Sequence, residues 1–187
     1  SLVGSEMCIR DRHSEVFVGW YMCESETFQT TYEALRNAFE RTGFMPYELV
    51  ADNQAGFTSK AAQRWRAKLE TISHTTTPEN GKSKTIESAF GRFQAEVLHR
   101  HINYTGGNIT AKSAKTKVDV AKIIQNVDAL PNYEEVRAQN EADINIWNSL
   151  PHPKFAGKSR MDVYRSSVNP QAIAVSYTHL TLPTNSR

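Results

Sequence analysis

Two acidic residues lie where a strand and a helix are expected to approach one edge of the fold. Asp52 directly follows the short apolar run Tyr47–Ala51, and Glu87 lies in the first turns of a helix expected from Ser83 to Arg100. In open α/β sheets, sites form in the space beyond the carboxyl ends of the strands. Taken singly, an Asp that opens a turn is usually a local cap, and a Glu early in a helix usually interacts with the helix dipole. The two carboxylates are therefore of interest as a pair.

Gly91 lies one turn after Glu87 in the same expected helix. A glycine inside a helix costs about 1 kcal/mol relative to alanine. A bare helix face beside a carboxylate is what the close approach of a bulky ligand requires. Close packing of the helix against a neighbour explains the glycine nearly as well, so both interpretations stay open.

The spacing of apolar residues predicts the elements that must position this pair. Strands and helices alternate through the first hundred residues, which is typical of an α/β layer fold with a mostly parallel section. We expect the three strands to share one sheet, with the first and third helices packed on it. The strands are expected at Glu15–Met22, Tyr47–Ala51 and Thr71–Thr76, and the helices at Thr27–Thr42 (with Ser25 as a possible cap), from Thr58 or Ser59 to Leu69, and at Ser83–Arg100, Lys117–Ala129, Tyr133–Leu150 and Ser159–Ser167.

Composition narrows the class of protein. The chain has 187 residues, 39% hydrophobic and 22% charged, which suits one globular domain. No apolar run is long enough to cross a membrane and no secretory signal is evident, so we expect a soluble, cytoplasmic protein with no membrane partner. Two cysteines do not make a disulfide framework. The net charge of +2 does not by itself indicate a nucleic-acid partner. The placement of the charges favours one more, because the segment Lys60–Glu70 carries four basic residues against one acidic residue.

The two ends differ in character from the rest of the chain. Residues 1–12 and 175–187 can each be back-translated into a sequence that resembles a sequencing-library adaptor. We interpret both as adaptor-derived and expect residues 1–11 and 175–187 to lack a consistent place in the core. The remaining organisation that we expect is a truncated core at 13–105, a loop and helix insertion at 106–131, and a helical segment of the core at 132–174.

The surroundings of the two carboxylates resemble a known family. Val50–Asn53, followed by Thr77–Phe90, is similar to the segments around the second Asp and the Glu of the DDE transposase and retroviral-type integrase superfamily. In that superfamily a strand ends on Asp-Asn or Asp-Arg, and a loop rich in Pro, Asn, Gly and Lys leads into a helix that begins Ile-Glu. Here 34 residues separate Asp52 from Glu87, which is close to the separation common in the superfamily.

Three further stretches extend the resemblance over most of the chain. His13–Trp20 is similar to the superfamily's Ser-Arg-x-x-Val-Gly-Trp strand, Ile146–His152 resembles its Tyr-Asn-x-x-Arg-Pro-His motif, and Gly157–Tyr164 resembles the helix that follows. Glu15 departs from the pattern because arginine is frequent there, and the insertion is unusual. A bacterial or phage transposase of the Mu-like kind is the subfamily that we infer.

The resemblance implies a fold, a chemical activity and the absence of one catalytic residue from this chain. The fold would be ribonuclease H-like, of the integrase catalytic-core type, truncated at the N-terminus and with a C-terminal helical extension. Three carboxylates of this family hold two Mg²⁺ (or Mn²⁺) ions for cleavage and joining of DNA phosphodiesters. The first Asp would lie upstream, so the fragment is expected to be inactive and its intact parent to act on transposon ends and target DNA as a homo-oligomer. The implied catalytic and metal-binding residues are Asp52 and Glu87, and the implied DNA-binding residues are Asn53, Lys60, Lys82, Lys84 and Arg92.

Two other functions stay open at this point. One is a DNA-binding or assembly module without catalysis, and the other is a nuclease on the same fold that cuts DNA but does not join it. An Asp on a strand upstream of the chain would favour the enzyme, and its absence would favour the binding module.

Overall fold

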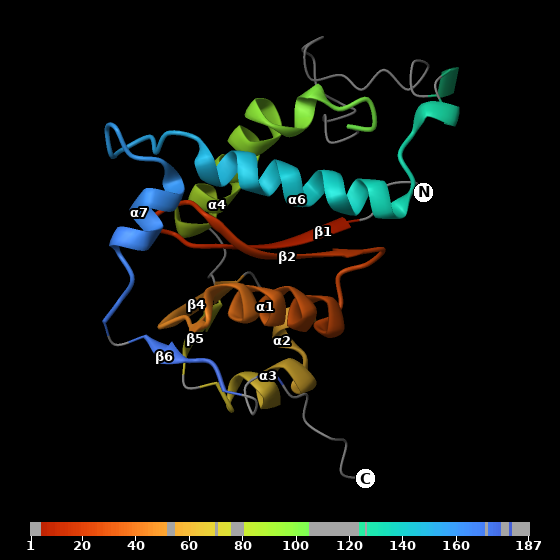
Figure 1. Ribbon diagram of the computed structural model, residues 1–187. Coiled ribbons are helices and arrows are strands. Elements are labelled where there is room, and N and C mark those ends of the chain that lie inside the picture. The colour runs from red at the N-terminus through yellow and green to blue at the C-terminus, as the bar shows by residue number, and fades with distance from the viewer. Residues whose placement is uncertain are drawn as a thin grey trace.

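A strand hairpin lies between two groups of helices in the computed structural model (Figure 1). Helix α1 (Phe28–Thr42) covers one side of the hairpin, and helices α4 (Gly81–Glu96) and α6 (Tyr133–Ser149) cover the other. The structure describes residues 5–51, 55–69, 71–75, 81–104, 124–125, 127–170, 172–176 and 180, and of residues 5, 6, 55, 74, 75 and 81–87 it describes the backbone alone.

The hairpin consists of β1 (Ser5–Arg10) and β2 (Phe17–Cys23), which pair antiparallel. Neighbouring residues of a strand point to opposite faces. Ile9 therefore packs against the core on the α1 side, whereas Cys8 and its partner Trp20 pack against the core on the side of α4 and α6. The hairpin thus supplies side chains to two cores.

The structure contradicts the prediction that both ends lack a place in the core. At the N-terminal end β1 pairs with β2, and Ile9 packs on the α1 core. At the other end Val175 and Leu180 pack against the same core, and the hydroxyl of Tyr32 donates a 2.5 Å hydrogen bond to the carbonyl oxygen of Leu180. The physical reason is that apolar side chains in these segments bury against α1 whatever the origin of their coding sequence.

Helix α1 has a well-defined start and end. Thr27, and not the expected Ser25, is the N-cap: its side chain accepts from the N–H of Thr30, and the hydroxyl of Thr30 accepts from the N–H of Thr27. The helix ends at Gly43, whose φ of 74° lies in the left-handed region that favours glycine. The α1 core is formed by the buried residues Tyr32, Leu35, Ala38, Phe39, Met45, Leu49, Phe57, Trp65 and Leu69.

Two further strand pairs lie beyond α1. Strands β4 (Glu48–Ala51) and β5 (Ile72–Thr75) are parallel, and the helices between them provide the crossover that parallel pairing needs. These helices are α2 (Ala55–Thr58) and α3 (Lys60–Arg66), and α3 begins after the N-cap Ser59 as expected. The remaining pair is antiparallel and consists of β3 (Phe44–Met45) and β6 (Ile173–Ala174).

The prediction of one shared sheet is wrong for the described strands. The strands expected at Glu15–Met22, Tyr47–Ala51 and Thr71–Thr76 are present, but β2 pairs with β1 alone and β4 pairs with β5 alone. The two pairs are separate ribbons in Figure 1. Local sequence pattern predicts that a strand forms, whereas the choice of neighbour depends on which other strands are present.

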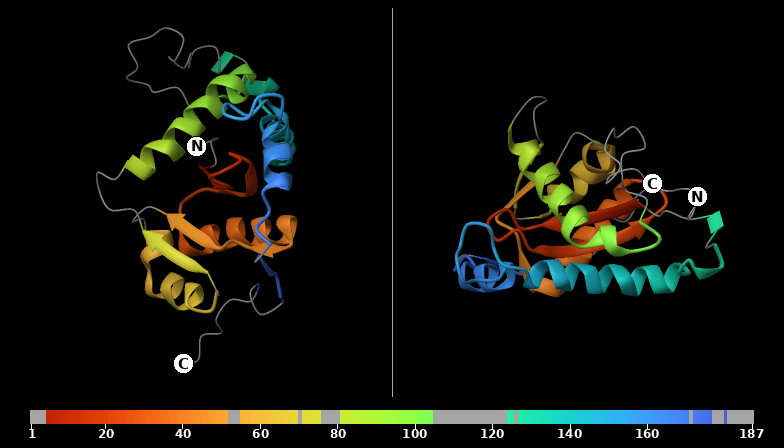
Figure 2. Two further views of the ribbon diagram at one scale, coloured as in Figure 1. Left: turned by 90° about the vertical axis from the view of Figure 1, so that its left-hand side faces the viewer. Right: turned by 90° about the horizontal axis from the view of Figure 1, so that it is seen from above.

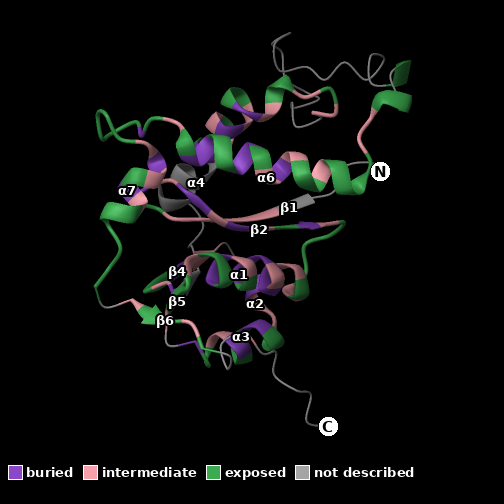
Figure 3. Cartoon of the chain, in the orientation of Figure 1, coloured by how far each residue is buried: buried purple, intermediate pink, exposed green. Residues whose placement is uncertain are grey.

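The second core lies between the hairpin, α4 and α6. Phe17, Phe93, Val97, Ile144 and Trp147 form it, and all five are almost completely buried. Figure 2 shows α4 and α6 crossing above the hairpin, and Figure 3 shows burial concentrated on their inner faces. The helices expected at Ser83–Arg100, Tyr133–Leu150 and Ser159–Ser167 are present, the first divided into α4 and the 3-10 helix η1 (Leu98–Arg100) and the last as α7 (Arg160–Ser166). The helix expected at Lys117–Ala129 lies largely outside the described residues, which include the 3-10 helix η2 (Val127–Ala129) there.

Candidate functional site

The carboxyl end of strand β4 is where the sequence analysis places Asp52. Ala51 is the last residue of β4 and pairs with Thr75 of the parallel strand β5. Asp52 and Asn53 themselves lie outside the described residues, so the structure reports neither their side chains nor the predicted approach of Asp52 to Glu87. The described backbone nevertheless ends β4 at Ala51, beside the parallel strand β5. Sites in α/β sheets usually lie beyond the carboxyl ends of such strands, which is where the sequence places Asp52.

Helix α4 carries Glu87 in its second turn. The side chains of Glu87, Lys82 and Lys84 lie outside the described part of the helix. Further along, Gly91 is exposed, and a Cβ atom added to it would meet no atom within 4 Å. Close packing against a neighbour therefore does not explain Gly91. The other explanation, a bare helix face for the approach of a ligand one turn from Glu87, stays open.

Helix α3 presents a basic face to solvent. Lys60, Arg64 and, beyond the helix end, Lys68 are exposed and recur every four residues, so they lie along one side. The opposite side buries Ala62 and Trp65, and Trp65 belongs to the α1 core. This exposed basic face is free to contact an anionic partner.

Arg66 of the same helix is engaged within the protein. Its guanidinium lies 4.2 Å from the centre of the Phe57 ring and donates a 2.9 Å hydrogen bond to the hydroxyl of Ser73 on β5. Burial lowers the pKa of Arg66 from its ordinary value. Arg66 thus ties α3 to β5 and is not one of the basic residues that face solvent.

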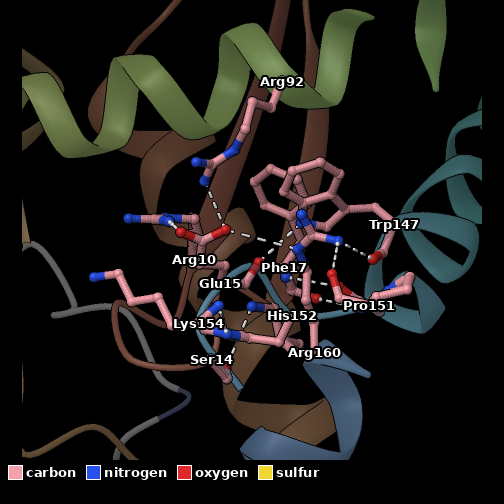
Figure 4. A network of polar contacts seen from close by, with 12 residues as sticks. Arg10, Ser14, Glu15, Phe17, Arg92, Trp147, Pro151, His152, Lys154 and Arg160 are labelled. Carbon is pink, nitrogen blue, oxygen red and sulfur yellow. Dashed lines mark hydrogen bonds and ion pairs between the residues drawn. The ribbon is translucent and has the colours of Figure 1, made fainter. Parts of the chain in front are cut away.

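Glu15 is the centre of a cluster of arginines (Figure 4). Its carboxylate lies 2.6 Å from Arg92 on α4, 3.8 Å from Arg10 on β1 and 3.7 Å from Arg160 on α7. The side chains of Arg10 and Arg160 are only 6% and 3% exposed, and burial is the main cause that lowers the pKa of both. Arg92, a predicted DNA-binding residue, is therefore ion-paired with Glu15 and 37% exposed.

Trp147 and Arg160 stack within this cluster. The Arg160 guanidinium lies 3.6 Å from the centre of the Trp147 ring and donates hydrogen bonds to the carbonyl oxygens of Trp147 and Pro151 at 3.4 and 3.3 Å. The Trp147 indole N–H donates to the carbonyl oxygen of Glu15 at 2.8 Å. The contacts join α6, α7 and the turn between β1 and β2.

The motif that resembles Tyr-Asn-x-x-Arg-Pro-His holds the hairpin in place. The side chain of Asn148 accepts from the N–H of Phe17 at 2.9 Å and donates to its carbonyl oxygen at 3.0 Å. His152, only 5% exposed, accepts from the N–H of Lys154 at Nδ1, and its Nε2 lies 3.2 Å from the carbonyl oxygen of His13. This geometry fits the tautomer protonated on Nε2. From the sequence, this motif is recognised only by its resemblance to the family. The hydrogen bonds that Asn148 and His152 make to the hairpin are not indicated by the sequence.

Asp143 is a second buried carboxylate that sequence reasoning missed. Its side chain is 1% exposed and lies 2.6 Å from Arg100 and 2.8 Å from Nε2 of His101. Both partners come from the segment just after α4, so the contacts bind this segment to α6. Asp143 follows Asn140 on the inner side of α6, and a charged residue at an inward position of a helix is the signal that could have identified it.

Clusters of metal-ligating side chains are absent from the described part of the chain. There, no three His, Cys, Asp or Glu side chains gather in a way that could hold a metal ion. Among the same residues, no helix is both long and apolar enough to cross a membrane. Asp52 and the Glu87 side chain, which the sequence predicts as metal ligands, fall outside the described part.

Comparison with solved structures relates this arrangement to known proteins. The BIV integrase catalytic core domain matches 88% of the chain and 87% of its own length, with a TM-score of 0.58 and 13% identity. The HTLV-2 integrase catalytic core domain, solved in complex with magnesium, matches 86% of the chain and 92% of its own length, with a TM-score of 0.53 and 15% identity. The chain has an integrase-type catalytic-core fold. This fold is of the ribonuclease H-like α/β class, in agreement with the fold class inferred from the sequence.

A larger assembly also matches the integrase-type fold. The simian T-cell lymphotropic virus intasome, solved in complex with a PP2A regulatory subunit, matches 93% of the chain with a TM-score of 0.55 and 15% identity, and the chain covers 57% of the matched intasome chain. No protein-family model and no curated protein matches the sequence. At these identities the comparisons establish the fold, and function requires a separate argument.

Proposed function

We propose that the chain is a fragment of a DDE-type transposase or integrase, of a bacterial or phage Mu-like kind, whose intact parent cleaves and joins DNA phosphodiesters. The observation that carries the proposal is the agreement between the integrase-type fold and the positions of two acids in the sequence. Asp52 directly follows the last residue of β4, and Glu87 lies in the second turn of α4. The sequence motifs select these two positions independently of the fold.

The chemistry of the proposed ligands fits a divalent cation. Asp52 and Glu87 offer carboxylate oxygens, which Mg²⁺ prefers over nitrogen or sulfur. Bound Mg²⁺ or Mn²⁺ would supply the charge that assists in-line displacement at a phosphodiester. In this proposal Asp52 and Glu87 hold the cations, and a third carboxylate comes from a strand upstream of the chain. The fragment has two of the three acids and is therefore expected to be inactive.

The charge distribution supports DNA as the substrate. Lys60 and Arg64 of α3, with Lys68 just beyond its end, form the exposed basic face of this helix, the second helix after Asp52 in the chain. We propose that this face contacts backbone phosphates, together with Asn53, Lys82 and Lys84. Arg92 would contribute through its exposed part while it remains paired with Glu15. The partners of the parent would be transposon ends, target DNA and further copies of the same protein.

The deciding experiment restores the upstream coding sequence. The 187-residue chain and the extended protein are incubated with DNA carrying a labelled 3′ end and with Mg²⁺ or Mn²⁺. We expect no nicking or joining by the chain alone, and metal-dependent cleavage and strand transfer by the extended protein. Asp52→Asn and Glu87→Gln should each abolish both reactions while circular dichroism and the melting temperature stay unchanged, because both substitutions preserve shape and remove charge.

A matched control separates charge loss in general from loss of these two acids. Glu134→Gln removes a carboxylate whose side chain is 74% exposed at the start of α6, and it should leave both reactions unchanged. Cleavage that survives Glu87→Gln would show that Glu87 is the wrong residue. Cleavage without joining would identify a nuclease, and DNA binding without either reaction by the extended protein would identify a binding module.

A further inference from the structure

Three arginine side chains surround a single carboxylate, that of Glu15 (Figure 4). Arg10 lies 3.8 Å from this carboxylate, Arg92 2.6 Å and Arg160 3.7 Å. In the described part of the chain, these arginines form no ion pair with any other carboxylate. We call Arg10, Arg92 and Arg160 the arginine cluster. Because arginine stays protonated in proteins, three positive charges here face one negative charge.

The next acidic residues do not balance this excess of positive charge. Burial lowers the pKa of both Arg10 and Arg160, and the charges of Asp11 and Glu96 oppose this effect only in part. The carboxylate of Asp11 is engaged by Ser14, whose N–H and hydroxyl each donate a hydrogen bond of 2.7 Å to it. Glu96 is exposed to solvent. The arginine cluster therefore keeps a surplus of positive charge next to the protein interior.

The arginine cluster also carries hydrogen-bond donors without acceptors. The Nε atoms of all three arginines are buried, and none of them donates a hydrogen bond to a described residue. The side chains of Arg10 and Arg160 are only 6% and 3% exposed. Buried polar groups are normally hydrogen-bonded, and a buried charge is costly unless it is paired. Unpaired donors and surplus charge at one place together favour the binding of an anion.

Arg10 and Arg92 are the members of the arginine cluster that a ligand can reach. Arg92 is 37% exposed, and the neighbouring Gly91 leaves open space beside it. Arg10 is one of the residues that line a cavity of about 740 Å³. Arg160 is held by its stacking on Trp147 and by its hydrogen bonds to two backbone carbonyl oxygens. Arg10 and Arg92 can therefore donate to a ligand, whereas Arg160 adds its charge from the interior.

The charge of the arginine cluster favours a terminal phosphate over other anions. A phosphate monoester carries a charge of about −1.5 to −2 at pH 7, which matches the surplus left after Glu15 has neutralised one arginine. Guanidinium groups present parallel N–H donors that fit the oxygen atoms of phosphate. A phosphodiester within a DNA strand carries only one charge and would leave part of the surplus without a partner.

We propose that Arg10 and Arg92 bind a dianionic phosphate group, with the charge of Arg160 behind them. The phosphate is either inorganic phosphate or the terminal phosphate of a nucleic-acid strand, which offer the same chemistry. The site shares Arg92 with the proposed function but does not depend on it, because phosphate binding requires neither Asp52 nor Glu87. Arg10 belongs to the segment that we interpret as adaptor-derived and Arg92 does not, so the variants below test the two residues separately.

Nuclear magnetic resonance of the arginine Nε–H groups tests the proposal on the 187-residue chain. The protein is labelled with ¹⁵N and titrated with sodium phosphate above the second pKa of phosphate, which is about 6. Sodium chloride keeps the ionic strength constant. The Nε–H signals of Arg10 and Arg92 should shift and reach saturation as phosphate is added. Shifts no larger than those caused by chloride alone would overturn the proposal.

Single substitutions identify the residues that hold the phosphate. Arg10→Gln and Arg92→Gln each remove charge-assisted hydrogen bonds and should each weaken phosphate binding about tenfold or more. Glu15 keeps two arginine partners in either variant, so both should fold, and circular dichroism checks this. Arg41→Gln is the matched control, because Arg41 is 31% exposed and is paired with one carboxylate, that of Glu141, at 2.8 Å. Unchanged affinity in either cluster variant, or an equal loss in the control, would overturn the proposal.

Removal of the internal counter-charge provides an independent test. Glu15→Gln leaves the arginine cluster without its carboxylate, so it should bind phosphate more tightly, on the order of tenfold. Phosphate should also raise the melting temperature of this variant more than that of the original protein, because a ligand stabilises the state that binds it. An equal rise in both proteins would count against the site. The two arginine variants keep the proposal testable if Glu15→Gln does not fold.

Two oligonucleotides distinguish the sources of the phosphate. They have the same single-stranded sequence, and one ends in a 5′-phosphate whereas the other ends in a 5′-hydroxyl. Shifts of Arg10 and Arg92 with the 5′-phosphate form alone would identify a strand terminus as the ligand, and shifts with inorganic phosphate alone would identify free phosphate. Equal shifts with both oligonucleotides would indicate backbone phosphodiesters and overturn the proposal. An extended protein that binds phosphate but does not cleave DNA would retain this site and overturn the proposed function.

Discussion

The indole nitrogen of Trp147 donates a 2.8 Å hydrogen bond to the backbone carbonyl oxygen of Glu15, a residue 132 positions earlier in the chain. Glu15 has a φ of 62°, in the left-handed region that a residue with a side chain seldom adopts. The same residue also carries the carboxylate that faces Arg10, Arg92 and Arg160. The turn of the hairpin is therefore held by Glu15 through both its backbone and its side chain.

Glu15→Gln should destabilise the protein strongly. The substitution leaves the buried guanidinium groups of Arg10 and Arg160 without their counter-charge, which costs about 3 kcal/mol. Urea unfolding followed by circular dichroism measures the loss. As a control, Glu40→Gln removes one partner of an exposed ion pair with Arg36, where both side chains are 45% exposed, and should cost less than about 1 kcal/mol. Equal effects of the two substitutions would contradict the buried character of the cluster.

Glu141 should make stability depend on acid pH. Burial alone would raise the pKa of Glu141, but hydrogen bonds from Arg41 and from the Trp20 indole, at 2.8 and 2.7 Å, outweigh it and hold the pKa below its ordinary value of 4.5. Because the folded state favours the carboxylate, its contribution is present above pH 4.5 and is lost as the pH falls through the lower, folded value. With a side chain 39% exposed, the contribution should not exceed about 1 kcal/mol.

The measurement for Glu141 compares urea midpoints of two proteins across this pH range. The difference between the original protein and Glu141→Gln should be largest near neutral pH and should shrink below pH 4.5. A difference that stays constant down to about pH 2 would show that Glu141 does not stabilise the fold through its charge.

Local elements were predictable from the sequence because their signals are local. The spacing of Phe28, Tyr32, Leu35 and Phe39 specifies the buried side of α1, and Gly43 ends the helix by a conformation that glycine favours. The apolar run before Asp52 likewise predicts strand β4. For the candidate site, these local patterns predict that Asp52 follows a strand and that Glu87 lies on a helix. The roles proposed for both residues come from the resemblance to the family.

Contacts between distant segments were not predictable in the same way. Nothing near Glu15 in the sequence indicates Arg160, and nothing near Asp143 indicates His101. The first pair forms only when α7 packs against the hairpin turn, and the second only when α6 packs against the segment after α4. The division of the strands into pairs was also missed. Strand pairing depends on which neighbours are available, and periodicity does not report this.

Gly19→Ala should destabilise the contact between β2 and α1. A Cβ atom added to Gly19 would lie 2.5 Å from both the Cβ and the backbone nitrogen of Ala38, so the helix and the strand would have to separate. Overpacking of this kind costs about 1–3 kcal/mol. Gly91→Ala is the matched control, since an added Cβ atom meets nothing within 4 Å there, and helix propensity should make that variant slightly more stable. A neutral Gly19→Ala variant would contradict the close approach.

Binding of the 187-residue chain to DNA should depend on the exposed basic face of α3. We expect affinity for a short duplex, measured by fluorescence anisotropy, to fall with rising salt, and the removal of one phosphate-binding side chain should reduce the slope of log K against log salt by about 0.9. Lys60→Gln and Arg64→Gln together should therefore lower the slope by about 2. Arg36→Gln is the control for this prediction. It removes a charge of the same sign on α1 that is already paired with Glu40, so it should leave the slope unchanged.

The substituted residues of α3 and α1 lie on helix surfaces, so the variants should fold normally, and circular dichroism checks this. If the double variant keeps the original slope while its fold is intact, α3 does not contact DNA, and the basic side chains at the start of α4 become the next to test.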